Sequence, residues 1–242
     1  MINMLTSTRL HKEIANFYKH VRPRKFEHTI RTNILDKLQG HLRNDSVFRD
    51  TSIKPFGSFA SDLYLPIADL DVVVCSRSLL QQDLPKLIGN RPLFRFRNVV
   101  LKNGLAKNGS IETITKAKVP LVKYVDQETG LRMDVSFESL TGIEAIETFA
   151  EWRTRYPAMP VLVTLIKHFL NMRGLNEPVN GGIGGFTVTC LVVSMFQMMP
   201  QVQSQSLMPE HHLGEMLMEF FLLYGSTSVS YTHLTLPTIL RV

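Results

Sequence analysis

The run Asp69-Leu70-Asp71-Val72-Val73-Val74-Cys75 limits most strongly how this chain can fold. Its β-branched and apolar side chains predict a strand buried within a sheet. Because side chains alternate across a strand, Asp69 and Asp71 are expected on one face and the apolar residues between them on the other. Two neighbouring carboxylates repel each other unless a cation lies between them. The pair therefore predicts a site for a hard cation such as magnesium.

The remaining periodicity predicts a mixed unit of strands and helices between helical segments. Helices are expected over residues 7–20, 28–43, 93–105, 143–149, 161–170, 186–199 and 213–224, and extended segments over 110–115, 119–125 and 131–137. The last two segments flank a turn-rich stretch at 126–130, which predicts an antiparallel hairpin. The fold class is therefore α+β with a domain border near 145–155.

A third carboxylate, Asp134, lies in the strand predicted over 131–137 and faces away from its apolar neighbours. If this strand lies near the Asp69 strand, three carboxylates converge, and two metal ions about 4 Å apart could serve an in-line displacement at phosphorus. Asp62 and Asp126 are weaker candidates, because Asp62 precedes an irregular segment and Asp126 lies in the turn.

Gly57 and Ser58 precede the aspartates and offer a backbone that can approach a phosphate and a hydroxyl that can bind it. Either feature alone is more often a Gly-Ser turn or a pair of solvated aspartates. Their occurrence together, in this order, favours a nucleotide site.

The composition limits the class of protein. A net charge of +6 and a pI of about 9.4 favour an anionic partner, although only modestly. The two cysteines, Cys75 and Cys190, lie in separate apolar runs without metal-ligand spacing and suggest buried thiols in a reducing compartment. Neither a secretory signal nor a membrane span is expected.

These motifs resemble the signature of the DNA polymerase β-like nucleotidyltransferases, and more narrowly the non-canonical poly(A) polymerases of TRAMP-type RNA surveillance complexes. The resemblance covers roughly residues 8–225 and is carried by four segments. They are Gly57-Ser58 through Asp69-Leu70-Asp71, Ala117 to Lys123, Met133 to Glu138, and Ile166 to Phe186.

The resemblance implies a role for each matching residue. Asp69, Asp71 and Asp134 would be the catalytic, metal-binding carboxylates. The nucleotide would be held by Gly57, Ser58, Lys167, Gly185 and Phe186. From the sequence alone, Lys167 is equally well explained as a lysine whose stem lies along apolar neighbours, and Phe186 is better explained as a core aromatic.

The resemblance also implies the domain organisation. Residues 22–150 would form the catalytic nucleotidyltransferase domain, and residues 1–21 and 151–225 an incomplete helical central (PAP-associated) domain. Residues 226–242 do not look like family sequence, which suggests a truncated or wrongly joined reading frame and leaves the base-recognition segment missing. Thr141 stands where the subgroup often has an asparagine that binds the nucleotide.

The implied activity is template-independent addition of adenosines to RNA 3′ ends in nuclear RNA surveillance, with ATP as substrate and Mg²⁺ or Mn²⁺ as cofactor. The implied partners are a zinc-knuckle RNA-binding protein and an RNA helicase, with tailed RNA passed to the exosome, in the nucleus or nucleolus. Basic side chains that could guide RNA, each of which is by itself better explained as part of a solvated face, are Arg22, Arg24, Lys25, Arg91, Arg95, Arg97, Lys102 and Lys107.

Three alternatives remain open at this point. A terminal uridylyltransferase would keep the chemistry and change the base. A catalytically silent scaffold would bind RNA or protein partners without reacting. A nucleotidyltransferase acting on small molecules is the weakest alternative, because of the Lys167–Phe186 segment and the basic charge.

Overall fold

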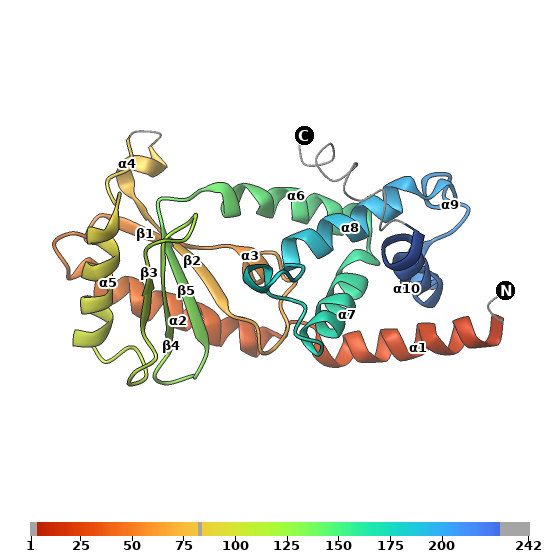
Figure 1. Cartoon of the computed structure of the whole chain (residues 1–242), viewed down its shortest axis with the longest axis horizontal. Helices are drawn as coiled ribbons and strands as arrows, with labels where there is room; N and C mark the ends of the chain where they lie inside the picture. Colours follow the sequence, from red (N-terminus) through yellow and green to blue (C-terminus); the bar gives the residue numbers. More distant parts are fainter. Residues whose placement is uncertain (1–3, 82–83, 228–242) are drawn as a thin grey trace. The chain divides into compact units, whose positions relative to one another are not determined.

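The structure is a computed structural model that describes residues 4–81 and 84–227 of the chain. Two compact units make up the chain (Figure 1). The sheet unit is Arg22–Ala150, and the helical unit is Met1–Val21 together with Glu151–Val242. Within the described part of the chain, every helix is too short or too polar to span a membrane.

Five strands form one mixed sheet in the sheet unit. They are β1 (Thr51–Pro55), β2 (Leu70–Ser76), β3 (Glu112–Ile114), β4 (Leu121–Val125) and β5 (Arg132–Phe137), in the order β1-β2-β5-β4-β3. β2 and β5 pair in parallel, and the other neighbours pair antiparallel. The α+β class with a mixed sheet and the hairpin of β4 with β5 are both confirmed.

The sheet separates a large apolar core from a face that carries polar groups. Leu70, Val72 and Val74 of β2 are fully buried and join Met133 and Val135 of β5 in the core cluster. Asp71 and Asp134 lie on the opposite face, because they occupy the alternate positions of the same strands. The alternation predicted from the sequence is therefore the one that the sheet adopts.

The helices of the sheet unit are α2 (Lys25–Arg43), α3 (Gly57–Ala60), α4 (Arg77–Leu80), α5 (Asn90–Lys102) and the first part of α6 (Thr141–Arg155). α2 and α5 pack against the sheet (Figure 1). They do so because each presents a stripe of buried residues to the core. The stripe of α2 comprises Ile34, Leu35, Leu38 and Leu42, and that of α5 comprises Leu93, Phe96, Val99 and Val100.

The helical unit comprises α1 (Met4–Val21), the last part of α6, α7 (Met159–Asn171), η1 (Pro178–Asn180), α8 (Gly185–Met198), α9 (Pro200–Gln203), η2 (Pro209–His211), α10 (Leu213–Leu222) and the π-helical turn η3 (Leu223–Thr227). α1 packs against α7 and α10. The ring centroids of Phe17 and His168 lie 5.0 Å apart, and Leu213 donates its N–H to His11 Nδ1 at 3.2 Å. The first segment of the chain is thus tied to helices that follow it by more than a hundred residues.

Two local expectations differ from the structure. The helix expected over 93–105 occupies Asn90–Lys102. The last helix does not end cleanly at Gly225, since a π-helical turn continues to Thr227. Gly57-Ser58 opens the short helix α3. The non-family segment predicted over 226–242 lies, beyond residue 227, outside the described residues.

Candidate active site

The strands β2 and β5 bring Asp71 and Asp134 side by side. The two residues are direct partners in the parallel ladder. Partners across a ladder project from the same face, so both carboxylates stand on the polar face of the sheet. Asp69 lies one residue before β2 begins. The nearness of the two separate acidic segments, which the sequence left conditional, is present in the structure.

A lysine for which the sequence predicted no role contacts one member of this acidic pair. Lys123 of β4 pairs with Asp134 in the antiparallel ladder, and its Nζ lies 2.5 Å from Asp134 Oδ2. The Asp134 side chain retains only 20% of its exposure. This short charge-assisted hydrogen bond holds the carboxylate in place. The hairpin contained part of the signal, but a shift of register by one residue would have put Lys123 on the other face.

Gly57 brings the backbone of α3 against the acidic pair. Its φ is +64°, and a Cβ added there would lie 2.6 Å from Asp71 Oδ2. The N–H of Phe56 donates to the carbonyl of Asp71 at 3.0 Å, which ties the start of α3 to β2. Ser58 follows directly in α3. The predicted Gly-Ser motif and the predicted carboxylate are therefore neighbours.

The donor set fits a divalent cation. Asp71 and Asp134 supply carboxylate oxygens on one face, the ligands that magnesium and manganese prefer. At this position Asp134 Oδ2 already accepts a hydrogen bond from the Lys123 ammonium. Within 4–81 and 84–227, no three His, Cys, Asp or Glu side chains are grouped closely enough to hold one ion. The joint participation of Asp69 with the other two stays a prediction.

Three other acidic or thiol groups belong to the sheet unit. Asp126 is 4% exposed and accepts hydrogen bonds from the backbone of Glu128 and from the backbone and hydroxyl of Thr129. Asp62 is exposed and has φ +55°. Cys75 lies on the polar face of β2, where burial and then Glu138 raise the pKa of its thiol to about 11. It is therefore a protonated thiol at neutral pH and a poor metal ligand.

In the helical unit, two of the predicted nucleotide-binding residues are neighbours. Gly185 is the first residue of α8, and a Cβ added there would lie 3.2 Å from Lys167 Cε and 3.4 Å from its Nζ. The Lys167 side chain of α7 thus lies across the start of α8. The connection between η1 and α8, residues 181–184, includes Gly182, whose added Cβ would meet the carbonyl of Leu175 at 2.5 Å.

Phe186 is 52% exposed at the beginning of α8. The interpretation of this residue as a core aromatic is therefore wrong, because the first turn of α8 lies outside the buried stripe that starts at Val188. Its predicted role against a nucleotide base stays a prediction.

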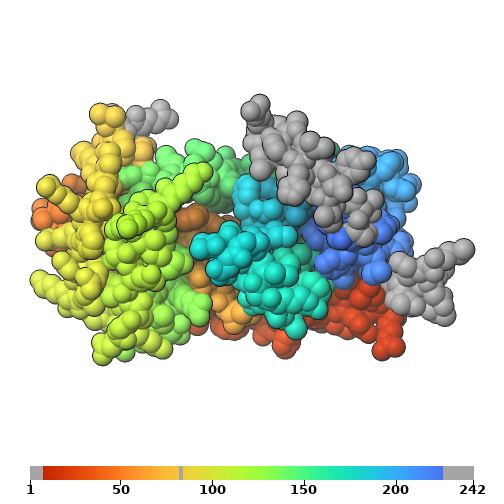
Figure 2. Space-filling model, in the orientation of Figure 1, coloured from red at the N-terminus to blue at the C-terminus, as the bar shows by residue number. Residues whose placement is uncertain are grey.

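The basic side chains proposed for an RNA path are all exposed. Four of them, Arg91, Arg95, Arg97 and Lys102, come from α5, whose outer side is visible in Figure 2. Arg95 is already paired with Asp45, with Nη2 2.7 Å from Oδ2. For Arg95, at least, part of its role is structural.

Comparison with known proteins identifies related chains over most of this sequence. A family model described as "Poly(A) RNA polymerase, mitochondrial-like, central palm domain" matches residues 10–153. Poly(A) RNA polymerase protein 1 of Saccharomyces cerevisiae is 38% identical over 216 residues, which is 89% of this chain and 32% of that protein. The chain thus spans about a third of the length of this relative.

Two further comparisons concern structure and activity. The solved polymerase core of TRAMP, an RNA surveillance complex, matches with a TM-score of 0.80 and 34% identity over 92% of this chain and 66% of that one. A Drosophila melanogaster relative described as an inactive non-canonical poly(A) RNA polymerase, Trf4-2, is 30% identical over 89% of this chain and 51% of that protein. The relatives thus include proteins named as poly(A) RNA polymerases and a protein named as inactive.

The structural match supports the polymerase-core fold, and the family model covers more than half of the chain with the Asp71 and Asp134 strands inside it. The family's central palm domain model matches residues 10–153, and this chain therefore belongs to the poly(A) RNA polymerase family.

Proposed function

We propose that this chain is the catalytic part of a template-independent RNA 3′-end adenylyltransferase. The observation that carries the proposal is the pairing of Asp71 with Asp134 on the polar face of the sheet, with Gly57 against Asp71. Two carboxylates beside a glycine that permits close backbone approach suit a nucleoside triphosphate and its cations. The inactive relative shows that family membership alone does not carry this proposal.

The domain assignment belongs to the proposal. Residues 22–150 are assigned as the nucleotidyltransferase domain, and residues 1–21 with 151–225 as the helical central domain. Gly57 and Ser58 are assigned to the triphosphate from the first domain. Lys167, Gly185 and Phe186 are assigned to the nucleotide from the second. The contact of Lys167 with Gly185 and the exposure of Phe186 support that assignment.

The cofactor is assigned as Mg²⁺, or Mn²⁺ in its place, held by Asp69, Asp71 and Asp134. When bound, such ions favour ionisation of the attacking 3′-hydroxyl and neutralise charge on the departing pyrophosphate. The protein's own contribution is placement. Lys123 holds Asp134 in its orientation, and the ladder holds Asp134 beside Asp71.

The proposed setting is nuclear RNA surveillance. The substrate would be an RNA 3′ end with ATP, and the partners a zinc-knuckle RNA-binding protein and an RNA helicase, which together select RNAs for the exosome. Similarity to the TRAMP polymerase core supports this setting. The positive net charge is consistent with an RNA substrate.

The test is a tailing assay with a 5′-labelled RNA oligonucleotide, Mg²⁺ and each nucleoside triphosphate separately. We expect extension with ATP and a loss of rate of about 10²–10³-fold or more in Asp71→Asn and Asp134→Asn, because each loses a charged oxygen at the reacting phosphates. Asp62→Asn is the matched control, since it removes a carboxylate from the same segment outside the paired strands. Its rate should equal that of the wild type.

The same assay separates the alternatives. Preference for UTP over ATP would replace adenylyl transfer by uridylyl transfer. RNA binding without extension by any nucleotide would favour a silent scaffold. Extension that survives Asp71→Asn unchanged would show that the assigned site is wrong.

A further inference from the structure

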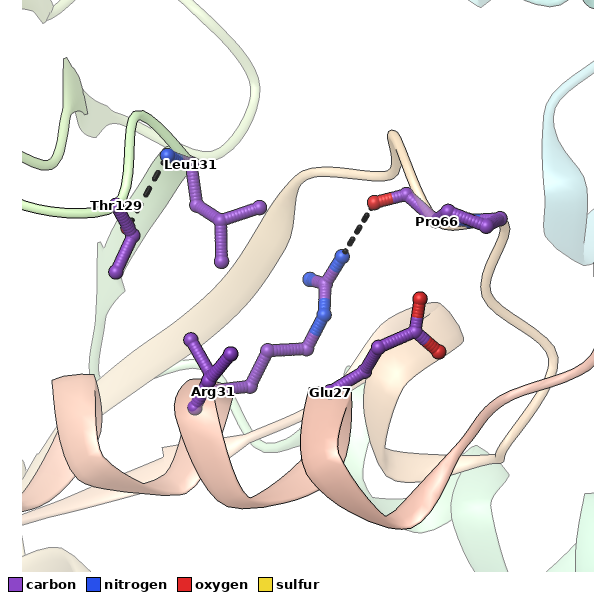
Figure 3. A pocket seen from close by; sticks show the side chains of 6 residues that line it. Glu27, Arg31, Pro66, Thr129 and Leu131 are labelled. Carbon is purple, nitrogen blue, oxygen red and sulfur yellow. Dashed lines mark hydrogen bonds between the residues drawn. The ribbon is translucent and has the colours of Figure 1, made fainter.

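An arginine buried in the core contacts the segment that leads into the acidic site. Arg31 of α2 is 2% exposed and is the largest of the fully buried side chains among the described residues. Its Nη2 donates to the carbonyl of Pro66 at 3.3 Å (Figure 3) and to that of Ala68 at 2.9 Å. Ala68 in turn donates its N–H to Leu65 at 2.9 Å, which closes a turn directly before Asp69.

The same guanidinium packs on two aromatic rings of the segment from Gly57 to Asp71. Its Cζ lies 4.6 Å from the ring centroid of Tyr64 and 5.9 Å from that of Phe59, and these two rings lie 5.6 Å apart. Phe59 belongs to α3, the helix that Gly57 opens against Asp71. Arg31 therefore contacts both α3 and the turn before Asp69.

The contact is electrostatic as well as apolar. A buried guanidinium keeps its charge and is stabilised by hydrogen-bond acceptors and by nearby anions. Burial lowers the pKa of Arg31 below its usual value, while Tyr64, Glu27, Asp69 and Asp71 act in the opposite direction. The positive charge is thus close enough to the site carboxylates to interact with both.

We propose that Arg31 is a positioning residue of the acidic site. By holding the turn that precedes Asp69 and the helix that abuts Asp71, it fixes where these carboxylates lie and so sets the affinity of the site for a divalent cation. This inference rests on the proposed function, because it concerns the site assigned there. Residues that orient metal ligands from behind typically change metal affinity or activity by about 10–100-fold when replaced.

The test measures Mn²⁺ binding by the whole chain, using electron paramagnetic resonance of the unbound ion. Arg31→Met keeps an apolar side chain in the core and removes every donor. We expect it to weaken Mn²⁺ binding by about 10–100-fold. Arg31→Lys keeps the charge but cannot donate from a planar guanidinium to two carbonyls. Its affinity for Mn²⁺ should therefore lie between that of the wild type and that of Arg31→Met.

Two controls separate positioning from general destabilisation. Val100→Ala removes buried methyl groups from α5, in the same core and outside the signature segment, and should leave Mn²⁺ affinity unchanged. Asp69→Asn should weaken Mn²⁺ binding directly, which shows that the measured ion occupies the assigned site.

The cavity beside Arg31 permits a rescue experiment. A cavity of about 280 Å³ is lined by Arg31, Glu27, Ile30, Pro66, Thr129 and Leu131 (Figure 3). Among the residues that the structure describes, none forms a hydrogen bond with Arg31 Nη1. Arg31→Ala extends this space, so added ethylguanidinium can occupy the position of the lost group. We expect ethylguanidinium to restore Mn²⁺ affinity in Arg31→Ala and to leave Asp69→Asn unchanged.

The outcomes are decisive in both directions. Equal Mn²⁺ affinity in the wild type, Arg31→Met and Arg31→Lys would overturn the inference, as would an equal loss in Val100→Ala. Failure of Arg31→Met to fold leaves Arg31→Lys and the rescue to decide. If Mn²⁺ affinity depends on both Asp69 and Arg31 but the wild type adds no nucleotide to RNA, the proposed function fails and the positioning role stands.

Discussion

At the scale of single residues, the acidic site depends on small distances between atoms of the backbone and the side chains. Asp134 is held by Lys123 Nζ at 2.5 Å, and Asp71 has the bare α-carbon of Gly57 against its carboxylate. A hydrogen atom in place of a methyl group is what leaves room for Asp71 Oδ2. The addition of one methyl group at residue 57 would therefore displace the Asp71 carboxylate.

Gly57→Ala is expected to lower tailing activity by about 10–100-fold, since a misplacement of roughly 1 Å in a reacting group has effects of that size. The added Cβ would meet Asp71 Oδ2 at 2.6 Å, and φ of +64° costs an alanine about 1–2 kcal/mol. Tailing rates and urea denaturation of the same samples measure the two effects.

Gly104→Ala is the matched control for this substitution. Its φ is +62°, so it carries the same backbone cost, but nothing lies within 4 Å of an added Cβ. It should lose similar stability and keep wild-type tailing. Equal losses of activity in the two variants would show that the clash with Asp71 has no specific effect.

At the scale of elements, tethers outside the sheet hold the connecting segments. Glu138, at φ +55° after β5, accepts hydrogen bonds from the backbone and hydroxyl of Ser76 and from the N–H of Lys86. Arg95 of α5 pairs with Asp45, just past the end of α2. The Arg95–Asp45 pair joins α5 to the end of α2, and the Glu138 hydrogen bonds hold the ends of β2 and β5 together.

Asp45→Asn is expected to destabilise the sheet unit by about 1 kcal/mol at neutral pH, the scale of a partly exposed ion pair. The amide keeps an oxygen for the N–H of Val47, which Asp45 Oδ1 now accepts at 2.9 Å, so the change removes mainly the charge. Burial by itself raises the pKa of Asp45, but the hydrogen bond and charge of Arg95 and the backbone donors outweigh it and leave the pKa below its ordinary value of 3.8.

The sign of the pH dependence follows from this lowered pKa. A carboxylate with a lowered pKa in the folded state contributes stability above its unfolded value, and loses that contribution as the pH falls through the folded value. The difference between the wild type and Asp45→Asn should thus be constant above about pH 5 and shrink below pH 4. Urea denaturation from pH 3 to pH 7 measures it, and a difference independent of pH would contradict the ion pair.

At the scale of the whole molecule, the two units have separate cores. The hydrophobic cluster around the sheet is built from residues between Ile34 and Val135. The helical unit buries Ile14 of α1 together with residues of α7, α8 and α10. The first segment of the chain therefore belongs energetically with its second half.

Ile14→Ala is expected to destabilise the helical unit by about 2–5 kcal/mol, because it leaves a cavity at a position that is 3% exposed. Hydrogen–deuterium exchange should show faster exchange in α7 and α10 and unchanged exchange in β2 and β5. Glu13→Ala, an exposed neighbour on the same helix, serves as the control and should leave both units unchanged. Equal loss of protection in β2 would show that the units unfold as one.

The sequence by itself determined the identity of the elements and one face of the site. Alternation in Asp69 to Cys75 and in Arg132 to Phe137 fixed which side chains point to the core, because a strand has a period of two residues. Apolar stripes at helical spacing fixed α2, α5 and α7 for the same kind of reason. These are local regularities, and they require no knowledge of the partner element.

Only the tertiary structure decided which elements are neighbours. The parallel pairing of β2 with β5 joins residues about sixty positions apart, and no local pattern specifies that pairing. The pairing of Lys123 with Asp134 depended on a hairpin register that a slip of one residue would reverse. The exposure of Phe186 and the burial of Arg31 likewise depended on what packs around each side chain, because burial is a property of the folded surroundings and not of the residue.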